Sequence, residues 1–371
     1  MGHSPVACTR PRVGALEVCV GVCTPRDCFI VQPAVLEHII RKGTPEQREW
    51  ALETLVRDHS IRTARLQDAL IASFTARPVR PFLESVVGTL KRIIYDAKGS
   101  DDPEATDVVR TEGGPDVADP AVNESYAGFG ATWKLYWEVY KRNSIDDMGL
   151  TLEGVVHYSQ NYDNAFWNGS RMIFGDGDGQ FLVRTTGSVD VIGHELTHGV
   201  TQYTANLAYT GQSGALNESV SDVFGSLVKQ YQAGQTADQA DWLIGAGIIG
   251  PAMNGKALRS MSHPGTAYDG DSQPADMSGY VQTTADNGGV HTNSGIPNCA
   301  FYHVAVNIGG HAWEKAGQIW YDSLRDPRLT ANASFQQFAD ITMRNARHLY
   351  GTGVEAKAVA AGWKAVGIVV S

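Results

Sequence analysis

Apolar and polar residues follow two different patterns along the chain. Between residues 91 and 184, short apolar runs alternate with polar positions, as in 154–158 and 171–174, and this period of two predicts β-strands. We expect one helix in this stretch, over 121–142. From Val189 to the C-terminus, apolar residues recur every three or four positions, which is typical of amphipathic helices. The pattern predicts an α+β fold, with a β-rich half followed by a helical half.

The residues before the β-rich half are expected to form an extension and a short helical unit. We expect residues 1–28 to be a disordered N-terminal extension. From residue 29 the pattern is helical, and Thr44, Pro45 and Gln47 supply an N-cap, a first-turn proline and a capping-box partner. The prolines at positions 78 and 81 then end the helical pattern and predict a linker.

Composition excludes several classes of protein. The 371 residues are 43% apolar and 19% charged, which is typical of a globular protein with two or three folding units. A net charge of −10 and the lack of a basic run argue against a nucleic-acid partner. No run approaches the roughly 18 apolar residues of a membrane helix, so we expect no membrane partner.

The N-terminus resembles a targeting signal only in part. Arg10 and Arg12 precede an apolar run over 13–23, but Glu17 interrupts this run and no A-x-A site follows. We therefore expect no functional signal peptide. The compartment stays open between secretion without a clear signal and the cytoplasm.

Cysteines are concentrated near the N-terminus. Cys8, Cys19, Cys23 and Cys28 precede the helical unit, and Cys299 alone lies in the rest of the chain. The main domains therefore cannot be closed by internal disulfides. A metal site at the N-terminal cysteines is one interpretation, but their spacing differs from the CxxC pairs of structural zinc sites. A disordered extension is the simpler interpretation.

The strongest chemical motif is the run from His194 to His198, an H-E-x-x-H sequence in a helical pattern. Positions i and i+4 share one face of a helix, so both imidazoles can reach one ion. Glu195 lies about 100° around the helix and can stand beside the ion without binding it. Neutral imidazole is a good ligand for zinc. The alternative is a helix with two chance histidines.

A catalytic zinc typically takes three protein ligands and keeps one position for water. Glu218, twenty residues after His198, is expected at the start of a second helix that turns back against the first. Asp222, one turn further, is placed to accept the outer N–H of a ligating histidine. For Glu218 alone, the alternative is a glutamate favoured by the helix dipole.

Six motifs in one order resemble the thermolysin-like zinc metallopeptidases, and the resemblance covers about residue 94 to the C-terminus. The short N-terminal unit resembles the protealysin branch, which carries a compact propeptide. The six motifs occupy residues 157–170, 174–180, 194–198, 214–222, 257–262 and 286–295.

This resemblance implies a two-domain fold with the HExxH helix between a β-rich and a helical half. It implies a propeptide over 29–77, a β-rich catalytic domain over 78–210 and a helical catalytic domain over 211–371. The implied activity is that of a zinc-dependent endopeptidase, made as a zymogen that cleaves itself between residues 72 and 87. Its partners are then a peptide or protein substrate and its own propeptide, and we expect a monomer.

The resemblance also implies the catalytic roles. Glu195 takes a proton from the zinc-activated water and delivers it to the leaving amine. His291 and Tyr209 donate hydrogen bonds to the oxyanion. Asp286, five residues before His291, is placed to orient its ring. The alternative for His291 is a histidine that caps a turn.

Substrate-binding residues follow from the same resemblance. Asn164, with the backbone of Ala165 and Trp167, matches positions that bind the peptide main chain, and Arg259 matches one that binds a substrate carbonyl. An alternative for Asn164 is a turn in an Asn-rich segment. Three apolar residues match the walls of the pocket for the side chain after the cut, or else are ordinary core: Val191, Leu258 and Ile244. Apolar walls predict an apolar substrate residue.

The chain departs from the family at its calcium site. Asp190 and Asp241 remain, but Lys229 stands where an acidic ligand is expected. Calcium prefers six to eight oxygens, so we expect calcium binding to be reduced or absent. We hypothesise that the Lys229 ammonium replaces one calcium and pairs with both aspartates. The alternative is a solvated helix lysine.

The run over 28–39 resembles the inhibitory motif of protealysin-type propeptides, with Gln32 and Pro33 in place of a double proline. His38 is either a zinc contact in the zymogen or, more simply, a surface histidine. Two other functions stay open: a zinc-binding module without activity, which would need none of the catalytic set, and an aminopeptidase, for which no acidic anchor motif is found.

Overall fold

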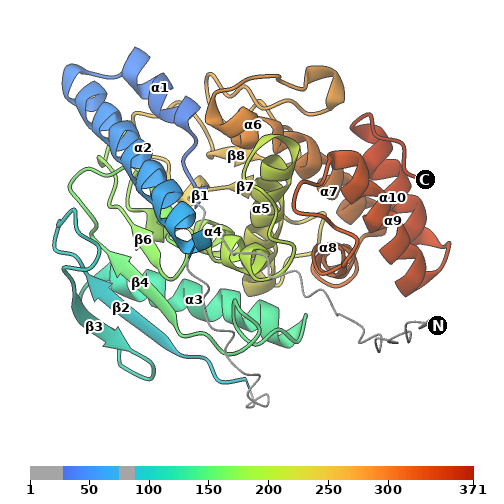
Figure 1. Cartoon of the computed structure of the whole chain (residues 1–371), viewed down its shortest axis with the longest axis horizontal. Helices are drawn as coiled ribbons and strands as arrows, with labels where there is room; N and C mark the ends of the chain where they lie inside the picture. Colours follow the sequence, from blue (N-terminus) through green and yellow to red (C-terminus); the bar gives the residue numbers. More distant parts are fainter. Residues whose placement is uncertain (1–27, 75–87) are drawn as a thin grey trace, which may run out of the picture.

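The computed structural model describes residues 28–74 and 88–371, and the side chains of 62–74 are outside this description. A β-sheet forms one side of the molecule and a group of helices forms the other, with α4 (Val189–Gln202) and α5 (Gly211–Ala233) between them (Figure 1). The structure confirms the α+β fold, with the six-stranded sheet before residue 189 and mainly helices after it. The predicted signal-like run, the linker prolines and three of the five cysteines lie outside the described residues.

The main sheet has six strands in the order β1-β5-β6-β4-β2-β3. Parallel pairing joins β2 to β4 and β4 to β6, and the remaining pairs are antiparallel. Each strand is short, as the brief alternating runs predict. The strands are β1 (Cys28–Phe29), β2 (Arg92–Asp96), β3 (Asp107–Thr111), β4 (Leu152–Val156), β5 (Ala165–Trp167) and β6 (Met172–Phe174).

The two faces of this sheet bury different side chains. Helix α3 (Pro120–Glu138) packs against β2 and β4, and it occupies the place predicted for the single helix of this half. On the opposite face Val155, Phe166 and Ile173 form a small apolar cluster with Phe29, and Ile61 packs against it. Ile61 belongs to α2 (Pro45–Phe74), so this helix of the N-terminal unit covers the second face.

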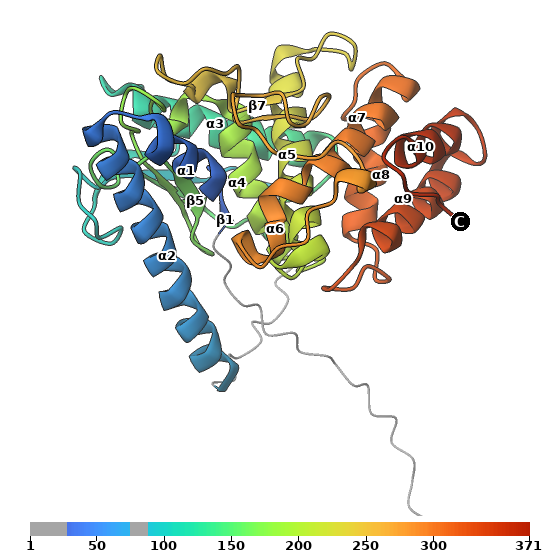
Figure 2. The same ribbon diagram turned by 90° about the horizontal axis from the view of Figure 1, so that it is seen from above.

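The N-terminal unit consists of β1, α1 (Pro33–Lys42) and α2. The predicted capping box forms at the start of α2, where the Thr44 N–H donates to Gln47 Oε1 at 2.7 Å and the Gln47 N–H donates to Thr44 Oγ1 at 3.4 Å. Seen from above, α2 extends beyond the body of the molecule (Figure 2). Through its described side chains, the unit touches the rest of the chain from β1, α1 and the first half of α2.

Helices α4 and α5 lie side by side and bury most of their residues. Close approach depends on small residues, since a Cβ at Gly225 would lie 2.4 Å from the Asp190 carbonyl on α4. The other helices complete the helical half: α6 (Asp286–Asn293), α7 (Gly295–Ile308), α8 (Ala316–Leu324), α9 (Phe335–Tyr350) and α10 (Val354–Ala365). A hairpin of β7 (Leu243–Ile244) and β8 (Arg259–Ser260) lies beside α5.

Among the described residues, every helix is too short or too polar to cross a lipid bilayer.

Candidate metal centre and cleft

Helices α4 and α5 bring two histidines and a glutamate together. His194 and His198 direct their Nε2 atoms toward each other at 2.9 Å. Glu218 approaches from α5, with Oε2 3.5 Å from His194 Nε2 and Oε1 3.5 Å from His198 Nε2. Ligands about 2.0–2.1 Å from a tetrahedral zinc would lie about 3.3 Å from one another. The three buried side chains therefore have the separations that a single small cation needs.

Outer hydrogen bonds fix which ring nitrogens face the centre. His194 Nδ1 lies 2.7 Å from Asp222 Oδ1, and His198 Nδ1 lies 2.9 Å from Asn217 Oδ1. Because both partners accept, each Nδ1 carries the hydrogen and each Nε2 presents a lone pair. Burial lowers the pKa of His198 to about 3, which favours the neutral ligand form.

The lone pairs and the carboxylate form an electron-rich centre, and the nearest basic group outside the three residues is His291, with Nε2 3.5 Å from Glu218 Oε2. Glu218 Oε2 is buried and accepts no hydrogen bond from the described residues. Two facing lone pairs beside a carboxylate repel one another, and a cation removes this repulsion. The donor set, two imidazoles and one carboxylate, is one that zinc accepts.

Arg259 holds the carboxylate behind His194. Its Nε and Nη2 atoms each donate to Asp222 at 2.8 Å, and Asn298 donates to the same carboxylate. Burial opposes ionisation of Asp222, but the Arg259 and His194 charges outweigh burial and hold its pKa well below the usual range. The negative charge behind His194 is therefore permanent, and it makes the ring a stronger ligand.

Glu195 lies beside this centre with one oxygen held and the other available. The Trp167 N–H donates to Glu195 Oε2 at 2.9 Å, whereas Oε1 accepts no hydrogen bond from the described residues. Burial, and then the charge of Glu218, raise the pKa of Glu195 well above its ordinary value. A carboxylate with a raised pKa next to a cation site is suited to accept and return a proton.

Two hydrogen-bond donors face the centre from the other side of the cleft. His291 on α6 lies with Nδ1 2.8 Å from Asp286 Oδ1 and Nε2 3.3 Å from the Tyr209 hydroxyl, which also donates to Glu218. Burial lowers the pKa of His291, but Asp286 and then Glu218 outweigh burial and raise it overall. Left-handed backbone at Gly288 and Gly289, with φ of 89° and 74°, folds Asp286 back toward the ring.

A peptide segment of the chain itself fills the cleft between these groups. Strand β1 pairs antiparallel with β5, and the Ile30 N–H donates to the Ala165 carbonyl at 3.1 Å. His291 Nε2 lies 2.9 Å from the Phe29 carbonyl, and Arg259 donates to the Ile30 carbonyl at 2.7 Å. Two consecutive carbonyls of an extended chain are therefore held by side chains at the centre.

Asn164 binds the main chain of Val31, the residue that follows Ile30 in the same segment. The Val31 N–H donates to Asn164 Oδ1 at 2.9 Å, and Asn164 Nδ2 donates to the Val31 carbonyl at 3.2 Å. The amide thus pairs with both main-chain groups of one residue, as a strand partner would. Among the residues expected to bind peptide, Asn164, Ala165 and Arg259 contact the segment, and Trp167 lies opposite Cys28 in the strand register.

Comparison with known proteins identifies the family. Residues 91–202 match the model of the thermolysin metallopeptidase catalytic domain, and residues 205–368 match that of its α-helical domain. This chain belongs to the thermolysin family of metallopeptidases. The metallopeptidase is 49% identical over 346 residues to an extracellular metalloprotease from Pectobacterium carotovorum subsp. carotovorum, which covers 92% of this chain and 96% of that protein.

Two further relatives differ in how much of the metallopeptidase they cover. A thermolysin from Alicyclobacillus acidocaldarius subsp. acidocaldarius is 42% identical over 258 residues, which are 67% of this chain and 46% of that protein. The solved precursor of protealysin, a metalloproteinase from Serratia proteamaculans, matches with a TM-score of 0.82 and 47% identity over 92% of this chain and all of that one. The similarity to this precursor includes the N-terminal unit.

The apolar residues expected to line a substrate pocket are all fully buried. Val191, Ile244 and Leu258 belong to the same apolar cluster as Ile30 and Val31 of the segment in the cleft. Both interpretations of these residues, core packing and contact with a bound side chain, are compatible with this position.

Lys229 lies between the two aspartates of the expected calcium site. Its Nζ atom is 2.9 Å from Asp190 and 2.8 Å from Asp241, and it donates to the Leu243 carbonyl at 2.6 Å. Burial lowers the pKa of Lys229, but Asp190 and then Asp241 outweigh burial and raise it overall. The lysine is therefore charged and held by three oxygen atoms.

Two expectations from the sequence need correction. Glu218 does not begin its helix, because α5 starts at Gly211 and Glu218 lies two turns inside it. Cys28 does not belong with a disordered extension, because it lies in β1 and is buried. Of the two interpretations of His38, the structure favours the simpler one, since its ring packs on Tyr268, with centroids 6.1 Å apart.

Sequence reasoning missed the partners of His198. Asn217 accepts from its Nδ1, and the Ser221 hydroxyl lies 3.0 Å from the same atom. Asn217 comes one position before Glu218, and Ser221 comes three positions after it. Their helical spacing places them on neighbouring parts of one face, so the signal was present in the motif over 214–222.

Proposed function

We propose that this metallopeptidase is a zinc-dependent endopeptidase that is made as a self-processing zymogen. The observation that carries this proposal is the extended segment in the cleft. Its Phe29 carbonyl is held by His291 beside the His194, His198 and Glu218 cluster. An extended peptide in this cleft therefore presents a carbonyl to the catalytic groups.

In this proposal His194, His198 and Glu218 hold the zinc ion. Zinc in such a site polarises water and lowers the pKa of that water toward about 7. Three protein ligands are the number that leaves one position for water in catalytic zinc sites. Asp222 and Asn217 keep the two imidazoles in the ligand tautomer.

Glu195 acts as the general base and then as the general acid. Its Oε2 atom is fixed by the Trp167 N–H, which leaves Oε1 to take the proton from the attacking water. The raised pKa of the carboxyl lets it hold that proton until the amine leaves. Correctly placed general acid–base groups typically contribute about 10²–10⁴ in rate.

His291 and Tyr209 stabilise the oxyanion that forms on the substrate carbonyl. His291 already lies within hydrogen-bond distance of a peptide carbonyl, that of Phe29. Asp286 raises the pKa of the His291 ring and directs Nε2 into the cleft. A positively charged donor is stronger than a neutral one, which favours the negatively charged intermediate over the substrate.

Substrates bind as an added strand along β5. Asn164, Ala165 and Arg259 hold main-chain groups, so they accept many sequences. Ile30, which follows the Phe29 carbonyl, is fully buried in the main apolar core, to which Val191 and Leu258 also belong. We therefore expect a preference for an apolar residue directly after the scissile bond.

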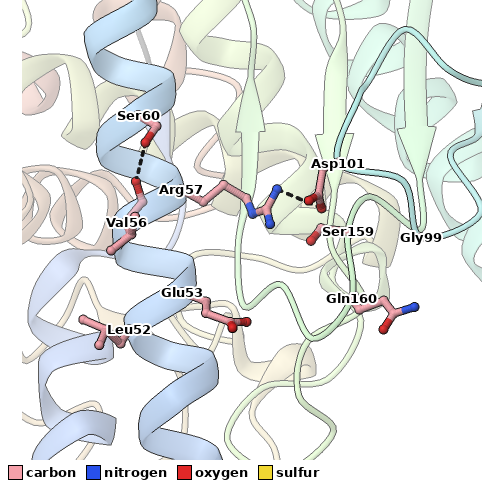
Figure 3. A pocket seen from close by; sticks show the side chains of 9 residues that line it. All are labelled: Leu52, Glu53, Val56, Arg57, Ser60, Gly99, Asp101, Ser159 and Gln160. Atoms are coloured by element: carbon pink, nitrogen blue, oxygen red, sulfur yellow. Dashed lines mark hydrogen bonds and ion pairs between the residues drawn. The ribbon is translucent and has the colours of Figure 1, made fainter.

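The N-terminal unit is proposed as the propeptide, over 29–77, with catalytic halves over 78–210 and 211–371. This unit fills the cleft, and polar contacts from α2 also join it to the rest of the chain. Figure 3 shows Arg57 of α2 reaching Asp101 across an open groove, at 2.8 Å. Asp58 accepts hydrogen bonds from the Tyr162 hydroxyl and from Asn164, at 2.6 and 2.8 Å. Self-cleavage is expected between residues 72 and 87, a region that the structure describes only up to residue 74.

Two further points concern ions and location. We propose that Lys229 replaces one calcium ion, because its ammonium already neutralises Asp190 and Asp241. The description of the Pectobacterium relative as extracellular favours secretion over the cytoplasm for this chain.

One experiment tests these proposals together. The purified wild-type chain and its Glu195→Ala variant are analysed for metal content, N-terminal sequence and cleavage of a peptide blocked at both ends. We expect one zinc ion in each protein. Only the wild type should mature and cleave the blocked peptide. Zinc-free active enzyme, or a pure Glu195→Ala protein that still matures, would contradict the proposal.

A further inference from the structure

Cys28 is the one chemically reactive residue of β1, and the proposed function gives it no role. It is 1% exposed and lies opposite Trp167 in the pairing of β1 with β5. Side chains alternate between the faces of a strand. Phe29 points into the apolar cluster under α2, so Cys28 points to the other face, toward α4 and α5.

The Cys28 side chain ends at the metal centre. Its sulfur, a ring nitrogen of His198 and a carboxylate oxygen of Glu218 all lie within 4.8 Å of one another, and all three residues are buried. Thiolate sulfur and imidazole nitrogen are the commonest zinc ligands, with Zn–S distances of about 2.3 Å. The cysteine therefore adds a strong ligand to one side of the cluster.

A second observation at the same site calls for a cation. Glu218 Oε2 is buried and accepts no hydrogen bond from any residue in the described ranges. A buried carboxylate oxygen without a donor is unfavourable by about 1–3 kcal/mol or more. A metal ion at this point would be reached by Glu218, by His198 and by the Cys28 sulfur, and His194 Nε2 lies 2.9 Å from His198 Nε2.

We infer that Cys28 is the fourth zinc ligand of the precursor and that it occupies the position that water needs for catalysis. This inference rests on the proposed zinc site. On coordination the S–H bond breaks, the sulfur keeps the electron pair and the proton is released to solvent. When the propeptide leaves, the thiolate takes up a proton and water replaces the sulfur.

This assignment explains how a peptide can lie in the cleft without being cut. The Phe29 carbonyl lies at His291 and the Ile30 carbonyl at Arg259, so the bond between these residues is presented in an extended form. Hydrolysis of that bond needs water beside Glu195. With sulfur in that position, the segment is held as a substrate would be while the nucleophile is excluded.

X-ray absorption at the zinc edge tests the inference on the full-length chain. The Glu195→Ala background keeps the precursor intact, and total zinc is measured on the same sample. We expect one sulfur at about 2.3 Å from zinc and nitrogen or oxygen ligands at about 2.0–2.2 Å. This measurement needs no change at Cys28, so it stands even if a Cys28 variant does not fold.

Two variants in the same background identify the sulfur. Cys28→Ser should lose the Zn–S signal while it retains one zinc per chain. A Cys8→Ser, Cys19→Ser, Cys23→Ser triple variant serves as the matched control and should keep the signal. Reconstitution with cobalt gives a second readout, since the sulfur-to-cobalt absorption band should follow the same pattern.

The outcomes separate this inference from the proposed function. One zinc per chain with only nitrogen and oxygen ligands would overturn the role of Cys28 and leave the zinc site intact. A sulfur signal that persists in Cys28→Ser, or that disappears in the triple variant, would also overturn it. A precursor that binds no zinc at all would contradict the proposed zinc site itself.

Discussion

Helices α4 and α5 carry two carboxylate clusters that differ in where their positive charge comes from. In the first, Glu218 and two histidines converge, and Glu218 Oε2 has no donor among the described residues. In the second, Asp190 and Asp241 surround the Lys229 ammonium at 2.8–2.9 Å. In the proposed function the first cluster takes an ion from solution, whereas the second contains its own cation.

The difference separates catalysis from stability. An external ion can present an exchangeable position to water, which a lysine cannot do, because its charge lies at the end of a covalent side chain. An internal ammonium is always present and does not depend on ion concentration. Cations are therefore expected to control activity at the first cluster and folding at the second, and the predictions below test this division.

Removal of zinc should have the largest effect. A zinc-selective chelator is expected to abolish hydrolysis and to lower the free energy of unfolding by about 4 kcal/mol if zinc had been present at 1,000 times its Kd. Added zinc should restore both. The measurement is peptide hydrolysis with thermal unfolding on the mature enzyme. Full activity in zinc-free protein would contradict the assignment of catalysis to a metal ion at the first cluster.

His291→Ala should lower kcat by about 10²–10³, the usual effect of losing one oxyanion donor. Zinc content should stay at one per chain, because His291 is not among the three proposed ligands. His303→Ala, on α7, is the matched control and should retain wild-type kcat. A His291→Ala enzyme that loses its zinc instead would assign this residue to the metal site.

Lys229→Met should lower the free energy of unfolding by about 3–5 kcal/mol, because it leaves the fully buried Asp190 carboxylate without its partner. Lys315→Met removes a lysine that is half exposed and pairs with Glu355, and its effect should be much smaller, because solvent screens an exposed ion pair. Denaturant unfolding measures both. Lys229→Glu should make stability depend on calcium, and equal stability with and without calcium in that variant would refute the replacement.

The smallest change in stability is expected from replacing His157, a third cationic side chain that lies between two aspartates. His157 lies 2.8 Å from Asp176 and 2.6 Å from Asp119, and the Asp176 hydrogen bond, against some loss from burial, raises its pKa to about 9. The folded pKa lies above the unfolded value of about 6.5. The stabilisation is therefore complete below pH 6.5 and is lost as the pH rises through 9.

His157→Asn tests this cluster without straining the backbone, since asparagine tolerates the left-handed φ of 56° at this position. Its Tm should fall below that of the wild type at pH 6, by an amount that corresponds to about 1 kcal/mol for a partly exposed pair. The difference should shrink toward pH 9.5. His263→Asn, at an exposed position, should show no such trend.

Local patterns predicted much of this molecule. The i, i+4 spacing of His194 and His198 places both rings on one face of α4, and the Thr44–Gln47 capping box forms where its residues indicate. Such features depend on residues a few positions apart. The pairing of His194 with Asp222 also followed, because a ligating histidine needs an outer partner.

Features that depend on distant contacts could not be predicted in the same way. His291 meets the Phe29 carbonyl across 262 positions, and no local pattern reveals the register of a two-residue strand. The start of α5 was missed because Gly211 and Gly214 are poor helix formers. Gly214 is required there, since a Cβ would lie 2.4 Å from Val290.

Strand β1 occupies the edge of the main sheet, so its departure changes what the enzyme can recognise. Removal of the N-terminal unit, as proposed, would leave β5 with a row of unsatisfied main-chain N–H and C=O groups at the sheet margin, which any extended chain can satisfy. Helices and closed sheets in a target protein have already used these groups internally. The mature protease should therefore cleave loops, termini and unfolded chains. Its selectivity among substrates should depend on the flexibility of the target segment more than on its sequence.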